Sequence, residues 1–502
     1  MKLFKRSEKP KTSNVSGFRP RTRNYSLGVV DRISADFSTE SQTADQAVFG
    51  ALHAARARAR VLESNDAHVR KFLLMAKTSV VGSKGMRLRS KAGDWKNNKF
   101  IPSRYDQQLI ETAYADFSKA WNFSIDQRLN RRRFAQVGIQ RVFVDGELIV
   151  QKIKGIKNTD NPYGYSLNMI DAERLDHRLN RKAGEGRNEI RMGVEIDARS
   201  RPVAYYFLKD APVQWTGISA IGNHDRIPAD QIIHIFIQER PGQTRGITWL
   251  APTGLRTRML DGITTAVTVG YRVAASKMGF FKRGEDYEPQ TDTDGNAIDN
   301  FADVPQDAEP GEFWELPKGL DFQTFDPGYP NTEYDGFKKS IVREIASGLG
   351  VSYNELGSDF EGVSYSAGQI GVHSDIAFWA DIQQFWIDAF EEPVYRDFLL
   401  MSITTGILPL PITRLYKFQS VDFQPPRRKH IDPKKTTDAQ NSALSALTRD
   451  PFDVCAENGT DFEDVCENTA RAIELLKENN LPIPALWGSA VVVQPTPDAP
   501  EE

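Results

Sequence analysis

A break in charge pattern constrains this chain more than any other feature of its sequence. Between Gly284 and Pro317 there is no lysine or arginine, while eleven acidic residues and several prolines and glycines fall in the same stretch. Such a segment is typical of an exposed, loop-rich insertion rather than of a hydrophobic core. Helical patterns flank it, one from Trp249 to Phe281 and one with an apolar stripe formed by Phe337, Ile341, Ile345 and Leu349. The sequence therefore predicts two neighbouring helices with a small acidic module at their far end.

The length of the chain requires more than one structural unit. It has 502 residues, whereas single hydrophobic cores stop growing at about 250–300 residues. A net charge of −3 argues against a protein that grips DNA tightly at a chosen sequence. The basic N-terminus lacks an apolar signal core, and glycine and proline interrupt the most apolar stretch, Leu399–Ile412. With only Cys455 and Cys466 as cysteines, we expect a soluble protein of a reducing compartment.

The segment before residue 250 mixes helical and strand patterns. Residues 1–24 are basic and nearly free of apolar side chains, which predicts a flexible arm that either contacts DNA or an acidic partner or is only solvated. A helical pattern from Thr43 to Val81 is interrupted by Ser64-Asn65-Asp66, which can cap a second helix. Three alternating arginines fit either a phosphate-contacting face or an exposed helix face that makes salt bridges: Arg56, Arg58 and Arg60.

Strand patterns follow a helical stretch over residues 110–139. β-type residues on both sides of Asp145-Gly146 predict a tight hairpin within Arg141–Ile153. Further strands are expected near Ser166, Arg191, Pro202 and Ile232. These patterns together predict a mixed α+β domain.

The C-terminal part is predicted to be mostly helical. Val351–Gly368 has the glycines, serines and acids of a loop, and a helical pattern runs from Thr437 to Asn479 before an acidic tail that we expect to be disordered. Between these lies a long amphipathic helix, whose apolar stripe is Val372, Ile376, Trp379, Ile382, Trp386 and Phe390.

Motifs for catalysis are missing from the sequence. It contains no P-loop, no H-E-x-x-H and no zinc-ligand spacing of its seven histidines. The two cysteines lie in acidic helical sequence, which does not activate a thiol as a nucleophile, so we expect them to be buried structural cysteines. Gly362–Ser366 (GVSYS) resembles a hydrolase elbow but lacks the final glycine and a preceding strand. Asp292–Asp299 (DTDGNAID) lacks the calcium-loop spacing, and Asp294-Gly295 favours a hairpin turn instead. We expect no catalytic residue, metal or cofactor; a metal-dependent hydrolase that uses the acidic segment remains the alternative enzyme hypothesis.

Three blocks of sequence resemble the lambda-type phage portal proteins. The first is RIPADQIIHIFIQERPGQTRGITWLAP (Arg226–Pro252), and the second is NMIDAERLD (Asn168–Asp176). The third joins FKKSIVREIASGLGVSYNEL (Phe337–Leu356) to GSDFEGVSYSAG (Gly357–Gly368), with Ser364 where the family usually has asparagine. The resemblance covers roughly residues 45–480. The order and spacing of the blocks make it more specific than any one of them.

The resemblance implies an α+β portal fold assembled as a ring, in which a central passage carries DNA. Two long stem helices would connect an α/β wing to a small β-containing clip, with a helical crown. The implied divisions are a basic arm (1–24), the wing (25–250), stem helix 1 (251–279), the acidic clip (280–330), stem helix 2 (331–350), the tunnel loop (351–367), the wing spine helix and return (368–430), the crown (431–485) and an acidic tail (486–502).

Candidate site residues follow from the same resemblance. Cations of the second stem helix would face the DNA passage or pair with acids of an adjacent subunit: Lys338, Lys339 and Arg343. The candidate tunnel loop comprises Ser358, Asp359, Phe360, Glu361, Val363, Ser364 and Tyr365. Clip acids would dock a basic motor or adaptor, or would repel DNA: Asp303, Asp307, Glu309, Glu312 and Glu315.

The implied function is structural and places the chain in the virion. The resemblance implies a homo-oligomer, usually of twelve subunits, at one vertex of the head, assembled in the host cytoplasm without a membrane. Its implied partners are double-stranded DNA without sequence specificity, the large terminase subunit, the major capsid and scaffold proteins, and a head–tail adaptor or neck protein. Another head–neck connector component is the alternative function.

Overall fold

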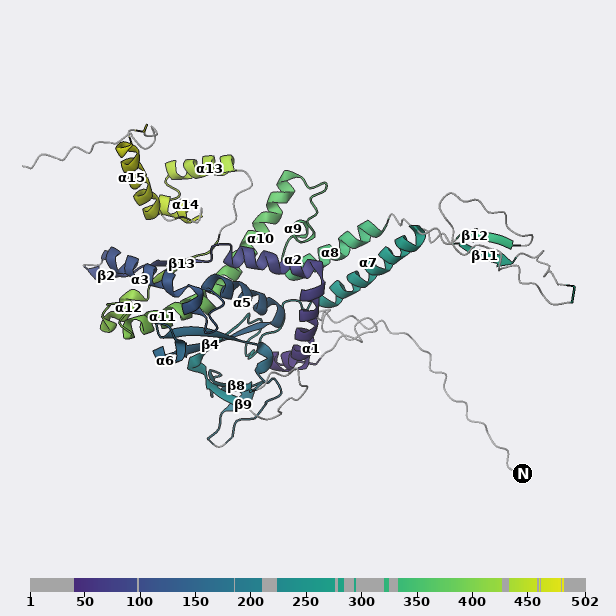
Figure 1. Ribbon diagram of the computed structural model, residues 1–502, viewed down its shortest axis with the longest axis horizontal. Helices are drawn as coiled ribbons and strands as arrows, with labels where there is room; N and C mark the ends of the chain where they lie inside the picture. The colour runs from purple at the N-terminus through teal and green to yellow at the C-terminus, as the bar shows by residue number, and fades with distance from the viewer. Residues whose placement is uncertain are drawn as a thin grey trace, which may run out of the picture. The chain divides into compact units, whose positions relative to one another are not determined.

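The computed structural model describes residues 40–96, 99–184, 186–209, 224–275, 279–283, 293–294, 320–324, 333–426, 433–457, 460, 462–479 and 481–482. The chain divides into two units, Met1–Thr43 and Ala44–Glu502, and only residues 40–43 of the first are described. The helices and strands below therefore all belong to the second unit (Figure 1).

Two helices and a π-helical turn open the second unit. Helix α1 (Ala44–Asn65) is followed at once by α2 (Ala67–Ala76), which continues as the π-helical turn η2 (Lys77–Val81). Asp66 caps α2, because its side chain accepts a hydrogen bond of 2.8 Å from the backbone N–H of Val69. The capping predicted at Ser64-Asn65-Asp66 is thus confirmed.

The predicted hairpin at Asp145-Gly146 is wrong. Arg131–Asp145 is helix α5, and the chain turns at Gly146 directly into strand β4 (Glu147–Lys154). The β-branched and aromatic residues before the turn are buried in the helix, so tertiary packing overrides their strand preference. Gly146 has φ +86°, and a Cβ there would overlap the backbone of Ile247. The glycine therefore serves a helix end and a close backbone approach rather than a hairpin.

Two antiparallel sheets confirm the remaining predicted strands. In the three-stranded sheet, β4 lies between β10 (Ile232–Phe236) and β5 (Tyr165–Ile170), with Val150 opposite both Ile233 and Met169. The four-stranded sheet has the order β6 (Glu189–Arg191), β7 (Val194–Ile196), β8 (Pro202–Leu208) and β9 (His224–Pro228).

Smaller elements complete the described fold. Three two-stranded sheets pair β1 (Arg87–Ser90) with β13 (Val421–Gln424), β2 (Gly93–Lys96) with β3 (Lys99–Pro102), and β11 (Gly279–Arg283) with β12 (Leu320–Thr324). The shorter α-helices are α3 (Arg104–Phe117), α4 (Ala120–Phe123), α6 (Ile156–Thr159), α9 (Tyr353–Gly357) and α12 (Leu415–Phe418). Single 3-10 turns are η3 (Ala172–Arg174), η4 (Ala229–Gln231) and η7 (Ile412–Arg414).

The predicted amphipathic helix forms much of the core. Helix α10 (Tyr365–Trp386) continues through the π-helical turn η6 (Ile387–Glu391) into α11 (Glu392–Thr404). Its stripe is buried from Trp379 onward, whereas Ile376 is 38% exposed, so the first turns of α10 project from the core. Arg131 of α5 donates to Glu391 at 2.9 Å, which ties the π-helical turn to the neighbouring helix.

The C-terminal segment is helical as predicted. Its helices are α13 (Pro433–Ser445), α14 (Pro451–Glu457) and α15 (Phe462–Glu478). The expectation of buried cysteines is wrong, because Cys455 is half-buried and Cys466 is exposed. Among the described helices, none combines the length and hydropathy that crossing a membrane requires.

Candidate functional site: the α7–α8 helix pair and the loop before α10

The two helices predicted on either side of the acidic segment lie against each other (Figure 1). They are α7 (Gly254–Ala275) and α8 (Tyr334–Leu349). Arg256 forms an ion pair with Glu344, and the Tyr334 hydroxyl donates to Thr264 Oγ1 at 3.1 Å. Because higher numbers in α7 meet lower numbers in α8, the pair is antiparallel. The first helix ends before residue 279, where the structure has strand β11 instead.

The base of the pair is packed closely. A Cβ added at Gly348 would overlap the methyl group of Thr253, so α8 approaches the start of α7 at a residue without a side chain. The Trp249 indole N–H donates to the backbone oxygen of Leu349 at 3.0 Å. On α8, Ile345 and Leu349 of the predicted stripe are buried, whereas Phe337 is 49% exposed. The stripe therefore belongs to the core only over its second half.

Lys339 is the most strongly neutralised of the three candidate cations. Its Nζ lies 3.1 Å from Asp335, 3.5 Å from Asp359 and 3.4 Å from Glu361. The hydrogen bond that Lys339 donates to Asp335, together with the charges of Asp335 and Asp359, raises the pKa of the Lys339 amine. Lys339 consequently connects α8 to the candidate tunnel loop.

Arg343 is directed to the same loop. Its guanidinium lies 5.0 Å from the centre of the Tyr353 ring, and the Tyr353 hydroxyl donates to Asp359 at 2.6 Å. This hydrogen bond is the main reason that the pKa of Asp359 lies below its ordinary value. Lys338 is half-buried and forms no ion pair within the described residues. The structure thus brings Lys339 and Arg343 together with the loop and leaves Lys338 apart.

The candidate tunnel loop connects α9 to α10. Ser358 follows α9 in the left-handed region with φ 52°, and Phe360 at the tip is 66% exposed beside exposed Glu361. The loop ends where the Ser364 side chain accepts from the Ala367 N–H at 3.3 Å, and Val363 before it is half-buried. Tyr365 is the first residue of α10.

Ser364 acts as a helix cap in this position. Serine and asparagine are both favoured there, so the departure from the family pattern preserves the capping chemistry. A loop rather than a strand precedes it, and the hydrolase-elbow geometry considered for Gly362–Ser366 is therefore not formed.

Asp375 fixes the base of the loop. This buried side chain accepts hydrogen bonds from the Ser352 N–H at 2.7 Å and from the Ser352 hydroxyl at 2.6 Å. Burial raises the pKa of Asp375, and a hydrogen bond with Glu355 of α9 raises it further. Both ends of the segment from Ser352 to Ser364 are thus attached to α10.

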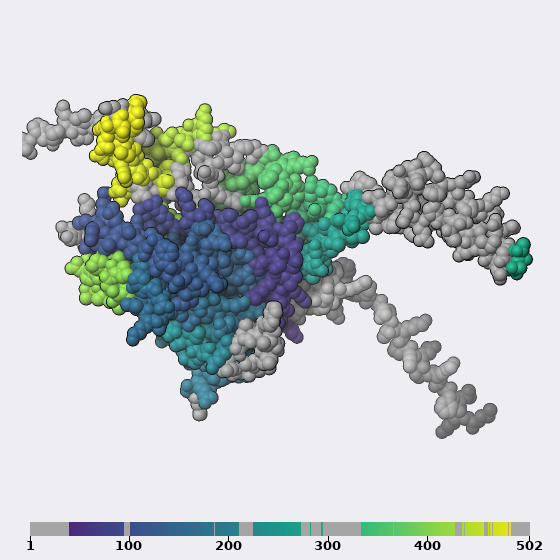
Figure 2. All heavy atoms as spheres, viewed as in Figure 1, coloured from purple at the N-terminus to yellow at the C-terminus, as the bar shows by residue number. Residues whose placement is uncertain are grey.

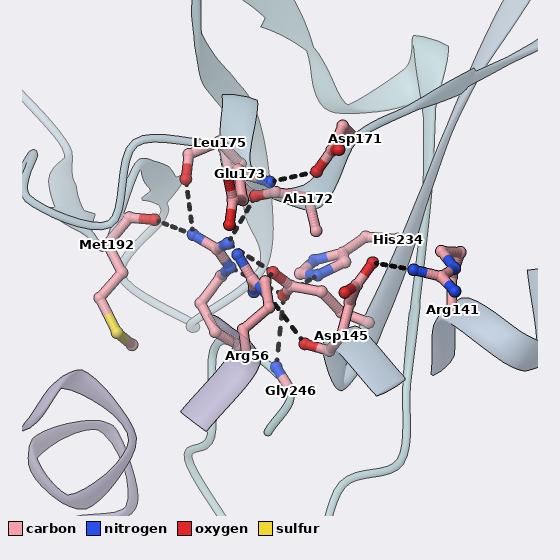
Figure 3. Close-up of polar contacts among 12 residues, drawn as sticks. Arg56, Arg141, Asp145, Asp171, Ala172, Glu173, Leu175, Met192, His234 and Gly246 are labelled. Atoms are coloured by element: carbon pink, nitrogen blue, oxygen red, sulfur yellow. Dashed lines mark hydrogen bonds and ion pairs between the residues drawn. The ribbon is translucent and has the colours of Figure 1, made fainter. Parts of the chain in front are cut away.

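A buried ion cluster centred on Glu147, the first residue of β4, was not anticipated from the sequence (Figure 3). Glu147 is fully buried. Its carboxylate accepts a hydrogen bond of 2.8 Å from Arg245 Nε and one of 2.7 Å from a guanidinium nitrogen of Arg56, and it lies 3.0 Å from His234 Nε2. Burial alone would raise the pKa of Glu147, but the charge and hydrogen bonds of Arg245 hold it well below the ordinary value. The cluster is compatible with burial because every charge in it has a partner.

Arg245 belongs to the PGQTRG part of the first sequence block. Its guanidinium also donates to the backbone oxygens of Met192 at 2.7 Å and Leu175 at 3.2 Å, so it joins the two sheets. The prediction of an exposed face for Arg56 is wrong, because only 3% of this residue is exposed. Its spacing from Leu52 and Ala59, both buried on the same side of α1, was the available signal.

The acidic segment lies largely outside the described residues. The candidate docking residues Asp303, Asp307, Glu309, Glu312 and Glu315 are among those outside, and of the possible calcium loop only Thr293 and Asp294 are described. Within the described ranges, no group of three or more histidine, cysteine or acidic side chains is arranged to hold a metal ion.

Comparisons with known proteins identify the family. Residues 31–383 match the model of the family described as "Phage portal protein, lambda family". The probable portal protein of Halomonas phage phiHAP-1 is 28% identical over 94% of this chain and 89% of its own length. Portal protein B of Escherichia phage lambda is 23% identical over 90% of this chain and 89% of its own length.

Solved structures that contain a similar chain include two particle necks. The neck of an empty GTA particle aligns with a TM-score of 0.43 and 11% identity, over 81% of this chain and 94% of that one. The neck of a native GTA particle aligns with a TM-score of 0.41 and 12% identity, over 82% and 96%. The order of the sequence blocks, the antiparallel pair α7–α8 and the match over residues 31–383 lead to one conclusion: this chain belongs to the lambda family of phage portal proteins.

Proposed function

We propose that twelve copies of this chain close into a ring whose α7–α8 pairs surround a passage for duplex DNA at one vertex of the phage head. The portal role itself follows from the family; the ring geometry and the roles of its parts are the proposal. The observation that carries it is an apolar stripe on α7 that no described part of the chain covers.

The α7 stripe consists of residues that fall on one side of the helix. Leu255, Met259, Gly262, Ala266 and Val269 lie at intervals of three and four, and all are exposed. Leu255 is 68% exposed, Met259 56% and Val269 51%. A contiguous apolar helix face of this kind is typical of an interface. A neighbouring copy would cover it and leave the α8 side of each pair for other contacts.

The candidate site residues divide into two roles under this proposal. Lys338, which has no ion pair of its own among the described side chains, would give the passage weak, sequence-independent attraction to phosphate. Lys339 and Arg343 would instead hold the tunnel loop, so that Phe360 and Glu361 at its tip face the DNA. A net charge of −3 suits such a passage, because strong phosphate contacts would retard sliding DNA.

Each division expected from the family keeps its proposed place. Residues 25–250 and 368–430 would form the wing, 280–330 the clip and 431–485 the crown. The clip acids would dock the terminase motor during packaging and later a neck protein, with DNA retained between these stages. No enzymatic step, metal or cofactor is proposed.

The experiment measures oligomeric mass and the dependence of assembly on the α7 stripe. In mass photometry, the purified full chain is expected at about twelve times its mass of 56.5 kDa. Met259→Glu with Val269→Glu should reduce it to small species. The control Tyr105→Glu with Ile412→Glu changes two large apolar side chains elsewhere that are also more than half exposed, and it should leave the ring intact. A wild-type chain that stays monomeric at several salt concentrations would overturn the proposal.

A further inference from the structure

A cluster of basic residues on α2, η2, the turn that follows η2, and α5 forms no ion pair with an acid in the described part of the chain. Among the described residues, none of its five members forms an ion pair: Arg70, Lys77, Lys84, Arg132 and Arg133. We call this cluster the α2–α5 basic surface. Figure 2 shows the purple-to-blue segment that contains α2 and α5 at the surface turned to the viewer.

The members of the surface come from adjacent elements. Arg70 and Lys77 are seven residues apart, two turns along the continuous helix formed by α2 and η2. Helix α5 packs beside this helix, and Gln136 of α5 donates to the Gly82 backbone oxygen at 3.0 Å. A Cβ built at Gly85 would lie 3.4 Å from the Arg132 Cβ, which places the Lys84–Gly85 turn against α5.

The surface is electropositive. The pKa of Lys77 is lowered, first by partial burial and then by the charges of Arg133, Arg70 and Arg141. Glu63 is the acid that opposes this effect, and it is already engaged in an ion pair with Arg141. Like charges gathered in this way repel one another in the isolated chain, and an anionic partner would relieve that repulsion.

The α2–α5 basic surface differs from Lys339 of α8 in how its charge is balanced. Lys339 on α8 is matched by three carboxylates, so its charge is compensated within the chain. On the α2–α5 basic surface no ion pair with a described residue balances the charges, although the chain as a whole is slightly acidic.

We propose that the α2–α5 basic surface binds the phosphate backbone of double-stranded DNA without regard to sequence, as a contact separate from the helix pair α7–α8. Arg70 and Lys77 are separated by about 10 Å along their helix, a length of duplex that carries about six phosphates. The binding site for an acidic protein usually has a centre of several aromatic or apolar side chains. On α2, Leu74 is the single large apolar side chain that is exposed, so this surface lacks such a centre.

Binding of a fluorescent 30-base-pair duplex to the purified full chain tests the proposal. A protein that carries Arg70→Gln, Lys77→Gln and Arg133→Gln should bind at least tenfold more weakly at about 50 mM salt. The slope of the logarithm of affinity against the logarithm of salt concentration should also become shallower, by the amount that about two to three phosphate contacts contribute. The matched control replaces three exposed basic residues elsewhere that form no ion pair with any described residue: Arg58→Gln, Lys157→Gln and Arg396→Gln. The control should bind within twofold of the unmodified protein.

A second variant and a second ligand make the result decisive. Arg70→Lys with Arg133→Lys keeps the charges and should bind as the unmodified protein does, which separates charge from folding. Equal loss in the glutamine variant and its control would overturn the proposal. Tighter binding of poly-glutamate than of duplex at this surface would also overturn it, in favour of an acidic protein. The measurement does not require ring closure, so a monomeric chain would contradict the proposed ring and leave this test intact.

Discussion

Replacement of Arg245 by methionine should destabilise the fold by about 3–5 kcal/mol, the usual cost of breaking a buried ion pair from one side. Arg245 is fully buried, and its removal takes two donors from Glu147 and leaves the Met192 and Leu175 carbonyl oxygens without their partner. Arg56 and His234 would remain beside Glu147, which keeps the expected cost near the usual range for a single pair.

Urea unfolding followed by tryptophan fluorescence measures this cost. Arg58→Met is the control, because Arg58 is an exposed arginine that forms no ion pair in the described structure, and it should change the free energy of unfolding by less than about 0.5 kcal/mol. Arg245→Met combined with Glu147→Gln should be less destabilised than the sum of the single variants, because each single change already removes the same Arg245–Glu147 ion pair. A cost below about 1 kcal/mol for Arg245→Met would refute the assigned role of the cluster.

Three further predictions concern acid, the helix pair and the loop. The pKa of Glu147 is depressed in the folded protein, so Glu147 stabilises the fold fully above the ordinary glutamate pKa of 4.5, and this stabilisation is lost as the pH falls below that value. The urea midpoint of unfolding should therefore decrease below pH 4.5, and it should decrease less in Arg245→Met. Gly348→Ala should lower the melting temperature through overlap with the Thr253 methyl group, and Thr253→Ser, which deletes that methyl group, should restore it; a fully stable Gly348→Ala would show that α7 and α8 are not so close. Lys339→Met should accelerate hydrogen exchange in the candidate tunnel loop with little change in melting temperature, whereas unchanged exchange would exclude Lys339 as its anchor.

Local chemistry made part of the fold predictable from sequence. The acidic break located the helix pair because two periodic stripes flanked a segment unable to form a core. The cap at Asp66 was predictable because capping is a local interaction: the backbone N–H that donates to Asp66 belongs to Val69, only three residues along the chain. The prediction at Asp145-Gly146 failed because it ignored long-range packing. The backbone of Ile247 lies so close that residue 146 must be glycine, and the sequence around residue 146 does not reveal this contact.

The site was less predictable than the fold. Helical periodicity placed Lys339 and Arg343 off the apolar stripe, and it carried no information about the loop acids that meet them. Arg56 lies on the buried stripe of α1, but its burial depends on Glu147, 91 residues away. Charged residues can be buried when such a distant partner exists, and a single sequence does not reveal the pairing.

A density map of the purified full chain by electron cryomicroscopy would show whether α7–α8 pairs form the wall of a closed ring. We expect a closed ring with an open centre, the α7–α8 pairs in its wall, and the stripe of Leu255, Met259 and Val269 covered by the neighbouring subunit. A ring in which this stripe faces solvent, or in which other elements form the wall of the opening, would contradict it.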